Sequence, residues 1–284
     1  MSKILITGAS GFIGKALATK LRDYEYDLVL VGSADGDIAC AETLNKLLDS
    51  DISHVFHLAG KTYVPDSWVN PDIFYRINLF GTTNVLEYCK SRGIAMTFVS
   101  AYVYGHPDSL PVKECDSIKP SNPYALSKRL AEEACEFYAE VHGLDVAVIR
   151  PFNVYGEGQD ERFLIPFIIR QVLTEDIIVV KDLLPKRDYV YLDDLVMALL
   201  ATVAMPKGYN VYNVGSGLSL SVSDVIDIVQ DVARTKKAVV SEGSVRANEL
   251  MDVVADISKA RQALGWQPQF SFREGIERMI NLNS

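Results

Sequence analysis

A tyrosine and a lysine four residues apart, Tyr124 and Lys128 in the segment NPYALSK, could exchange protons with a substrate alcohol. The segment opens a predicted helix, so this spacing puts both side chains on one helical face. A free phenol has a pKa near ~10 and is a poor base at neutral pH, but a neighbouring ammonium favours the phenolate and lowers that pKa. The pair predicts general acid and base chemistry, with an amphipathic helix that merely carries both residues as the alternative.

Ser100 ends a predicted strand in the segment TFVSAYVYG. Ligands of an open parallel sheet bind beyond the carboxyl ends of the strands, so a hydroxyl at this position would point at the ligand. A serine at a strand end is also common for turn formation alone. Its assignment to a site therefore depends on whether the chain builds a nucleotide-binding sheet.

The first residues of the chain, KILITGASGFIGKAL, predict such a sheet. A short apolar strand over 3–6 is followed by Gly8, Gly11 and Gly14 at the spacing of a strand-to-helix turn. These glycines would allow a tight turn, a close approach to a pyrophosphate, and close packing of helix on strand. The anion would meet the free N–H groups of a helix that begins near Phe12. The order of strand, glycines and helix favours this site over an ordinary tight turn.

Strands and helices alternate through the first 150 residues. Parallel strands need such crossovers, so the pattern predicts an α/β fold with a doubly wound, Rossmann-like parallel sheet. The predicted strands are 3–6, 27–31, 54–58, 95–100 and 144–149, and the predicted helices are 14–23, 40–49, 71–91 and 121–142, with a polar loop at 60–68. We assign residues 1–152 to a dinucleotide-binding domain.

The regular alternation of strands and helices ends after residue 152. We predict a smaller α/β substrate lobe over 153–284, with the segment 187–215 returning to the main sheet. Asp193 and Asp194 are expected to be the cap and first turn of one of its helices. The predicted helices are 163–174, 193–204, 223–234, 258–264 and 272–280, and the predicted strands are 177–180 and 211–214.

Composition excludes several classes of protein. A net charge of −9 over 284 residues argues against non-specific nucleic-acid binding, which needs a basic face. No apolar run reaches the ~18 residues needed to cross a bilayer, and no signal peptide precedes the first strand, so we expect a cytoplasmic protein without membrane contact. The cysteines are scattered without a CxxC pair, which predicts reduced thiols and no metal site or disulfide framework. They are Cys40, Cys89, Cys115 and Cys135.

Together these motifs resemble the extended short-chain dehydrogenase/reductase family of nucleotide-sugar epimerases, dehydratases and reductases, over nearly the whole chain. TGASGFIG at 7–14 resembles its cofactor turn, GDI at 36–38 its adenine contact, and HLAG at 57–60 the wall beside the dinucleotide. Asn78 in NLFGT and the segment RPFNVYG at 150–156 follow in family order. The resemblance implies NAD or NADP as cofactor, contacted by Gly8, Ser10, Gly11, Phe12, Ile13, Gly14, Ser33, Asp37, Ile38, Leu58, Ala59, Gly60, Asn78, Tyr124, Lys128 and Pro151.

The resemblance also implies the catalytic roles. Tyr124 would be the general acid and base at a sugar carbinol, Ser100 would bind the same oxygen, and Lys128 would hold the nicotinamide ribose. Hydride would pass between the sugar carbon and the nicotinamide. The nucleotide-diphosphate sugar would be bound by Thr62, Ser100, Tyr102, Tyr124, Asn153, Arg187, Arg246 and Glu249. Arginine suits a diphosphate because its fork binds phosphate oxygens bidentately, although both arginines could also be surface charges.

Departures from the family pattern narrow the reaction. The acidic pair of 4,6-dehydratases is replaced by Ala101 and Tyr102. The Cys and His of reductases that also epimerise neighbouring carbons are replaced by Tyr102 and Gly158. What remains is hydride transfer at a hexose carbon, C4 by preference, in a 4-keto-6-deoxy nucleotide-sugar reductase or a UDP- or dTDP-hexose 4-epimerase. A non-catalytic dinucleotide sensor is disfavoured because the Ser, Tyr and Lys are all present.

The end of the second strand bears on the cofactor. Relatives that hold NAD permanently usually have an acid there, on the adenosine ribose, whereas this strand ends Val31, Gly32, Ser33. The missing acid favours an exchanging cofactor, as in a reductase, but Asp35 or Asp37 could reach the ribose, so NAD and NADP both remain open. The resemblance further implies a homodimer formed by helices 71–91 and 121–142. His57, at the end of an apolar strand, is expected to be structural.

Overall fold

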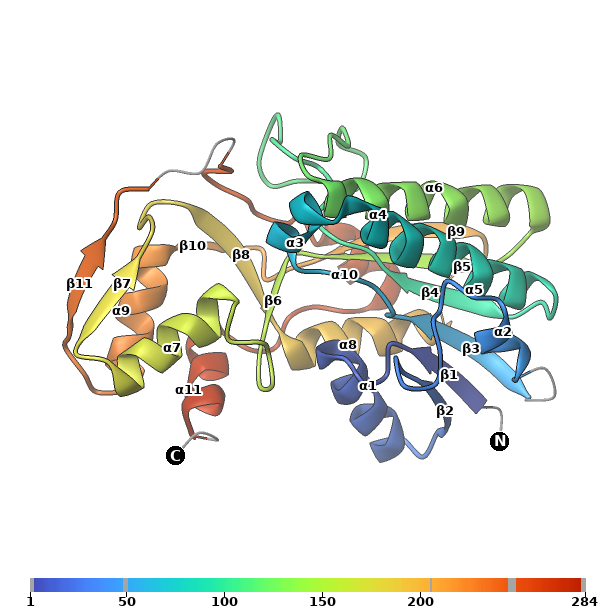
Figure 1. Cartoon of the computed structure of the whole chain (residues 1–284), viewed down its shortest axis with the longest axis horizontal. Helices are drawn as coiled ribbons and strands as arrows, with labels where there is room; N and C mark the ends of the chain where they lie inside the picture. Colours follow the sequence, from blue (N-terminus) through green and yellow to red (C-terminus); the bar gives the residue numbers. More distant parts are fainter. Residues whose placement is uncertain (1–2, 48–50, 205, 245–248, 282–284) are drawn as a thin grey trace.

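A six-stranded parallel sheet forms the centre of the larger part of the molecule (Figure 1). The computed structural model describes residues 3–47, 51–204, 206–244 and 249–281. The strand order is β2-β1-β3-β4-β5-β9, and every pairing in it is parallel. The strands are β1 (Lys3–Thr7), β2 (Asp27–Val31), β3 (Ile52–His57), β4 (Ala95–Val99), β5 (Val146–Pro151) and β9 (Tyr209–Val214). The order reverses at β1, which confirms the expected Rossmann-like sheet. Ligands of such sheets bind beyond the carboxyl ends of the strands.

Helices cover both faces of this sheet, which explains why its strands are apolar almost throughout. One face carries α1 (Phe12–Asp23) and α8 (Leu192–Ala201), whose apolar side chains pack on Ile4 and Ile6 of β1. On the other face, α5 (Gly81–Lys90) and α6 (Pro123–His142) pack around Leu5. A short helix, α2 (Glu42–Asn45), also belongs to this side. Successive side chains of β1 point to opposite faces of the sheet and therefore contribute to two separate cores.

Both ends of α6 follow from local sequence. The Asn122 side chain accepts a hydrogen bond from the N–H of Ala125 at 2.8 Å, which caps the first turn. Pro123 occupies the first helical position, where a missing N–H leaves no bond unmade. Gly143 ends the helix in the left-handed conformation, with φ of 69°. These signals fix the start of the helix that carries Tyr124 and Lys128.

A buried ion pair joins α6 to β5. The Arg150 guanidinium donates to both carboxylate oxygens of Glu132, Nε to Oε1 at 3.0 Å and Nη2 to Oε2 at 2.7 Å. The side chains are only 2% and 0% exposed. Arg150 also donates to the Tyr104 hydroxyl at 2.8 Å. The pair is bidentate and buried, so removal of one partner would leave the other as an uncompensated buried charge.

The smaller part of the molecule, on the left in Figure 1, contains two further sheets. The three-stranded sheet has the order β10-β8-β6, and the second pairs β11 with β7 in parallel. The strands are β6 (Asn153–Tyr155), β7 (Ile177–Val180), β8 (Lys186–Tyr191), β10 (Ser219–Ser221) and β11 (Ala238–Ser241). Helices α7 (Leu164–Thr174), α9 (Val222–Val232) and α11 (Phe272–Asn281) pack with them around a third core. Helix α10 (Ser258–Leu264) instead joins the core beside α8.

Several expected elements differ in the structure. The helix predicted over 71–91 is divided into α4 (Pro71–Phe74), a π-helical segment η1 (Tyr75–Phe80) and α5. The predicted loop at 60–68 contains the short helix α3 (Val64–Val69). Only Glu42–Asn45 of the helix predicted over 40–49 is α-helical, and residues 48–50 lie outside the described part of the chain. The sequence missed β6, β8, β10 and β11, which are short or carry charged and polar residues.

The segment 187–215 is shared between the two parts. Strand β9 joins the edge of the main sheet beside β5, whereas β8 belongs to the three-stranded sheet. Helix α8 begins at Leu192, so Asp193 lies inside its first turn rather than at its cap. Asp194 faces the tail of the chain and accepts the N–H groups of Gln269 and Phe270. A 3-10 turn (Thr202–Ala204) follows α8. The division into domains at residue 152 stays a prediction.

Within the described ranges, no helix combines the length and the apolar character that a bilayer crossing demands.

Candidate active site

The glycine turn after β1 has the geometry of a phosphate cradle. Gly8 has φ of +73°, and a Cβ on it would lie 2.6 Å from the Ala59 nitrogen. A Cβ on Gly14 would lie 2.2 Å from the Gly8 oxygen, so neither glycine can be replaced without moving backbone. Gly11 precedes α1, and no described side chain caps the helix there. The N–H groups of the first turn, at 12–14, are therefore available to an anion, as a dinucleotide pyrophosphate requires.

Ser100 and the Lys128 ammonium both lie at the carboxyl end of β4. Ser100 is 3% exposed, and its Oγ has no hydrogen-bond partner among the described residues. The Lys128 ammonium donates to the carbonyl of the preceding residue, Val99, at 2.8 Å. A Cβ on Gly60, beyond β3, would lie 3.3 Å from Lys128 Nζ. The Lys128 ammonium thus lies between the carboxyl end of β4, which Ser100 follows, and Gly60, one of the wall residues expected to face a dinucleotide.

Tyr124 lies half-buried on the first turn of α6, with its ring edge-on to Phe74 at 6.2 Å. Burial raises the pKa of Tyr124 above its ordinary value, and burial lowers the pKa of Lys128 to about 8. The expected lowering of the tyrosine pKa by the lysine is therefore wrong for the ligand-free protein. The ammonium bonds the Val99 carbonyl, and burial disfavours the charged form of both groups. The phenol is neutral and can donate a proton.

Asn78, in η1, ties the loop after β3 to α6. Its Oδ1 accepts the N–H of Lys61 at 2.8 Å, and its Nδ2 donates to the Lys61 carbonyl at 3.0 Å. The same Nδ2 donates to Ser127 Oγ at 2.9 Å, and Ser127 in turn donates to the Tyr124 carbonyl at 2.7 Å. Asn78 is buried and positions its neighbours by these bonds. Ser127 was missed from the sequence, although it lies inside the NPYALSK segment.

His57 is a structural histidine, as expected. Thr82 Oγ1 donates to the Asn78 carbonyl at 2.6 Å, so it accepts from His57 Nε2 at 3.0 Å. His57 Nδ1 then accepts from Thr7 Oγ1 at 2.6 Å. This tautomer is assigned from the hydrogen-bond network. Burial, assisted by the Lys128 charge, lowers the pKa of His57 to about 3, and burial lowers the pKa of His54 to about 4.

Stability is expected to fall in mild acid because both histidines are buried neutral. Between the ordinary pKa of 6.5 and the folded value of about 3, the unfolded chain binds the His57 proton and the folded chain does not. Stability from His57 is thus fully present above pH 6.5 and decreases on acidification, by about 1.4 kcal/mol per pH unit. Urea unfolding at pH 7.5, 6 and 5 measures this slope. His57→Gln should flatten it, and exposed His106→Gln should leave it unchanged; equal slopes for all three proteins would contradict the assignment.

The residues predicted at the adenine end lie in different environments. Asp37 Oδ1 accepts the N–H of Ala39 at 2.9 Å, and its Oδ2 is ion-paired to Arg76 at 2.5 Å. These two contacts lower the pKa of Asp37. Ile38 is buried, whereas Ser33 is exposed. In the loop 32–38, the apolar side chain of Ile38 therefore packs into the core, and the Asp37 carboxylate is already paired.

Two of the candidate sugar-nucleotide residues, Asn153 and Arg187, lie on the strands β6 and β8. These strands pair in parallel, and the Asn153 amide donates to the Asp188 carbonyl at 3.2 Å. Arg187 donates to the Glu249 carboxylate and to the Leu250 carbonyl. Its charge opposes the burial that raises the pKa of Tyr102 to about 12, which links β8 to the segment after β4.

Four more predicted residues differ in their surroundings. The Tyr102 hydroxyl donates to the Gly105 carbonyl at 2.7 Å, and its ring packs edge-on against Phe152 at 5.3 Å. Pro151 is buried at the end of β5, and Thr62 is exposed in the loop before α3. Arg246 lies outside the described residues.

Asp188 is a buried residue that sequence analysis missed. Its carboxylate accepts the N–H groups of Ser216, Gly217 and Ala255, and the Ser216 hydroxyl, at 2.6 to 3.0 Å. Burial raises its pKa. These hydrogen bonds hold β8 against the turn after β9, and they therefore position the neighbouring residue, Arg187. The only sequence signal was an acid between Arg187 and the start of an apolar run, which also fits an exposed position.

No described group of three or more His, Cys, Asp or Glu side chains is arranged to bind a metal ion.

Comparisons with known proteins bear on this geometry. The model of the NAD dependent epimerase/dehydratase family matches residues 4–215. The GDP-6-deoxy-D-mannose reductase of Pseudomonas aeruginosa is 31% identical, over 98% of this chain and 96% of its own. The solved structure of RMD from Pseudomonas aeruginosa complexed with NADPH has a TM-score of 0.91 at 31% identity, covering 99% of this chain and 98% of that one. The Thermus thermophilus UDP-glucose 4-epimerase complex with NAD has a TM-score of 0.88 at 26% identity, covering 98% of each chain.

Proposed function

Because this chain belongs to the NAD dependent epimerase/dehydratase family, we propose that it is an NAD(P)-dependent nucleotide-sugar oxidoreductase. The reaction is hydride transfer at a hexose carbon, C4 by preference, and the favoured direction is reduction of a 4-keto-6-deoxy sugar. The substrate would be a nucleotide-diphosphate sugar, as the names of the relatives suggest.

The unpartnered hydroxyl of Ser100 carries this proposal. A buried hydroxyl normally has a hydrogen-bond partner, and this one has none among the described residues. It lies one residue beyond the Val99 carbonyl that holds the Lys128 ammonium, at the edge of the sheet where ligands of this fold bind. A substrate oxygen would supply the missing bond.

The residues fit a bound dinucleotide and a ketone. The turn at Gly8 to Gly14 would hold the pyrophosphate, and Lys128 and Asn78 would border the nicotinamide ribose. NADH or NADPH would supply hydride to the ketone carbon. Tyr124, neutral in the ligand-free protein, would donate its proton to the ketone oxygen while Ser100 donates a hydrogen bond to the same oxygen. The C=O group thereby becomes CH–OH, with one hydride and one proton added.

The reductase is supported by the GDP-6-deoxy-D-mannose reductase of Pseudomonas aeruginosa, which is 31% identical over 98% of this chain. Tyr124 would serve either reaction, because the phenol that protonates the ketone oxygen in reduction takes the alcohol proton, as phenolate, in oxidation. A nucleotide-hexose 4-epimerase remains the second candidate because the Thermus thermophilus 4-epimerase covers 98% of this chain with a TM-score of 0.88.

Cofactor consumption tests the proposal. Purified protein is mixed with a nucleotide 4-keto-6-deoxy sugar and NADH or NADPH, and absorbance at the nicotinamide band is followed. One cofactor oxidised per sugar reduced supports the reductase. Interconversion of UDP- or dTDP-hexoses without net consumption would favour the epimerase, and cofactor binding without either reaction would favour a sensor.

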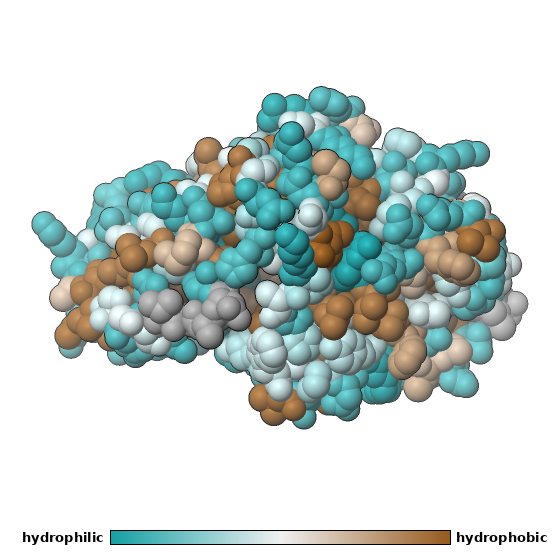
Figure 2. Space-filling model, turned by 90° about the horizontal axis from the view of Figure 1, so that it is seen from above, coloured by the Kyte–Doolittle hydropathy of each residue, from teal (hydrophilic) through white to brown (hydrophobic). Residues whose placement is uncertain are grey.

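We propose that the protein is a homodimer formed by the segment 71–91, which ends with α5, and by α6. Helices α5 and α6 pack side by side, and large apolar residues are exposed beside them: Phe80 of η1 is 58% exposed, and Phe137 and Val141 of α6 are 54% and 59% exposed. Figure 2, which looks down on this side of the molecule, has apolar residues in separate patches among hydrophilic ones. Covering such residues is the main driving force of association.

Light scattering is expected to give twice the chain mass of 31.5 kDa. Phe137→Glu should halve the measured mass, because a charge would be buried in the interface. Leu218→Glu is the control, since Leu218 is 72% exposed before β10 and away from α6. A wild-type monomer, or an unchanged dimer in Phe137→Glu, would contradict this interface.

We propose the cytoplasm as its compartment. Cys40, Cys89, Cys115 and Cys135 are free thiols, and Cys40 and Cys115 are exposed. Exposed thiols persist in a reducing environment.

A further inference from the structure

The segment after β2 lies against the glycine turn. Strands β1 and β2 pair up to Thr7 and Val31, so the residues that follow Val31 leave the sheet beside Gly8. A Cβ on Gly32 would lie 2.8 Å from Ser10 Oγ, which is one of the predicted cofactor residues. In folds of this kind, the adenosine ribose of a dinucleotide binds at this strand end.

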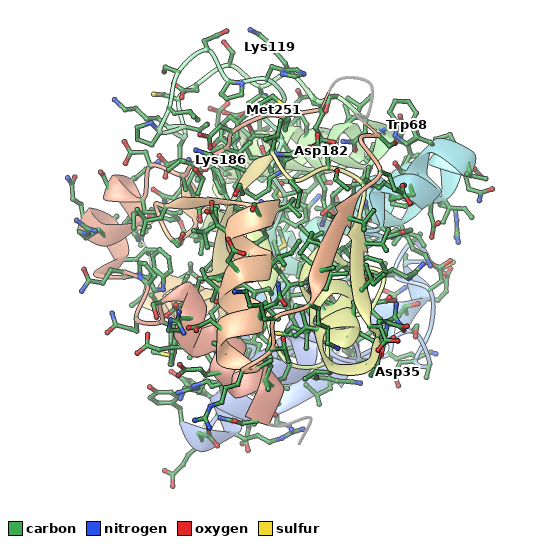
Figure 3. All side chains as sticks on the ribbon, turned by 90° about the vertical axis from the view of Figure 1, so that its left-hand side faces the viewer. Asp35, Trp68, Lys119, Asp182, Lys186 and Met251 are labelled. Carbon is green, nitrogen blue, oxygen red and sulfur yellow. The ribbon has the colours of Figure 1, made fainter. Side chains whose placement is uncertain are left out.

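A carboxylate is held at this point by a residue that is not the usual one. Gly32 donates its N–H to Asp35 Oδ2 at 2.8 Å, and Asp35 donates its own N–H to the Gly32 carbonyl at 3.1 Å. Asp35 Oδ2 lies 3.7 Å from the position of a Cβ on Gly32. The side chain is exposed and lies near the right-hand edge of the view in Figure 3. The missing acid of the strand end is thus replaced from three residues further on.

The other charged groups of this loop are less suitable. Asp37 is occupied by Arg76 and by the N–H of Ala39, and the same contact occupies Arg76. Lys46 also lies beside this loop, and its Nζ lies 3.5 Å from the Asp35 carbonyl oxygen rather than on its carboxylate. A 2′-phosphate at this strand end would therefore meet the Asp35 carboxylate beside Gly32, while Arg76 is paired with Asp37.

We propose that Asp35 makes the protein selective for NAD(H) over NADP(H). Its carboxylate accepts a hydrogen bond from a ribose hydroxyl of NAD(H) and repels the 2′-phosphate of NADP(H). The inference rests on the proposed dinucleotide-dependent function and concerns only the choice of cofactor. Because Asp35 is exposed, the repulsive part of the selectivity should decrease as salt rises.

Binding of the two reduced cofactors, measured by fluorescence titration without sugar substrate, tests this selectivity. Wild-type protein at low salt is expected to bind NADH roughly tenfold or more tighter than NADPH. With NADH, Asp35 accepts a hydrogen bond from the ribose hydroxyl, whereas with NADPH it repels the 2′-phosphate. Asp35→Asn should reduce that ratio by about tenfold, mainly through tighter NADPH binding. Asp27→Asn is the matched control, because it removes the same charge from the exposed opposite end of β2.

Three results would overturn the inference. Wild-type protein that binds NADPH more tightly than NADH would do so, as would Asp35→Asn with the same ratio as Asp27→Asn. If the ratio of NADH affinity to NADPH affinity stayed the same between 50 and 500 mM salt, repulsion of the 2′-phosphate by Asp35 would be contradicted. These outcomes leave the proposed function intact because a dinucleotide still binds, whereas failure of both cofactors to bind wild-type protein would contradict the proposed function itself.

Discussion

Tyr124→Phe is expected to lower the turnover of a nucleotide 4-keto-6-deoxy sugar by roughly 10² to 10⁴ fold. The substitution removes the one oxygen proposed to protonate the ketone and keeps the ring that packs edge-on to Phe74. The phenol is neutral in the ligand-free protein, because burial raises the pKa of Tyr124. The loss should therefore appear in kcat, with little change in the affinity for cofactor. Steady-state rates of NADH or NADPH oxidation measure it.

The matched control for this variant is Tyr138→Phe on the same helix. Tyr138→Phe also removes a phenol oxygen, but the Tyr138 hydroxyl donates to Glu87 on α5 and lies away from the proposed site. Turnover should stay close to that of the wild type. Thermal unfolding of both variants separates chemistry from stability. A Tyr124→Phe enzyme with near wild-type kcat would remove this residue from the mechanism, and Ser100 would have to act with another acid.

Glu132→Gln is expected to lower the free energy of unfolding by roughly 3 to 5 kcal/mol. The substitution leaves the Arg150 guanidinium charged, 2% exposed and without its carboxylate. The neutral amide offers one acceptor where the carboxylate accepted bonds from Nε and Nη2. Urea unfolding at neutral pH measures the change, and the loss should be seen without any cofactor.

A nearby exposed pair is the control for the buried one. Arg129 donates to Glu133 at 3.1 Å, but Glu133 is 53% exposed, so Glu133→Gln should cost less than about 1 kcal/mol. The double variant Glu132→Leu with Arg150→Met should recover much of the loss, because no buried charge is left. Equal effects of Glu132→Gln and Glu133→Gln would show that water reaches Arg150.

Much of the fold could be predicted because its signals are local. The glycine turn at Gly8 to Gly14, the cap at Asn122 with Pro123, and the alternation of apolar strands with helices each depend on neighbouring residues. They identify the sheet and the helix of Tyr124. The position of Ser100 followed from the same argument, since it comes directly after β4.

What could not be predicted depends on residues far apart in the chain. The Glu132 and Arg150 pair joins a helix to a strand, and the Asp188 carboxylate collects N–H groups from 216–217 and from Ala255. The three-residue strands β6 and β10 gain their pairing only from β8. Spacing puts Tyr124 and Lys128 on one face, but it does not reveal that the ammonium bonds the Val99 carbonyl.

The position of β9 in the main sheet limits how this protein can be divided into fragments. The chain leaves the main sheet after β5, builds β6 to β8, and comes back through α8 and β9 before it leaves again. A fragment ending at residue 152 would keep the nucleotide turn, but it would lose the strand that closes one edge of the sheet and the helix that shelters α1. Grafting a new substrate specificity onto this scaffold therefore means exchanging internal loops, since the two parts are not separable modules.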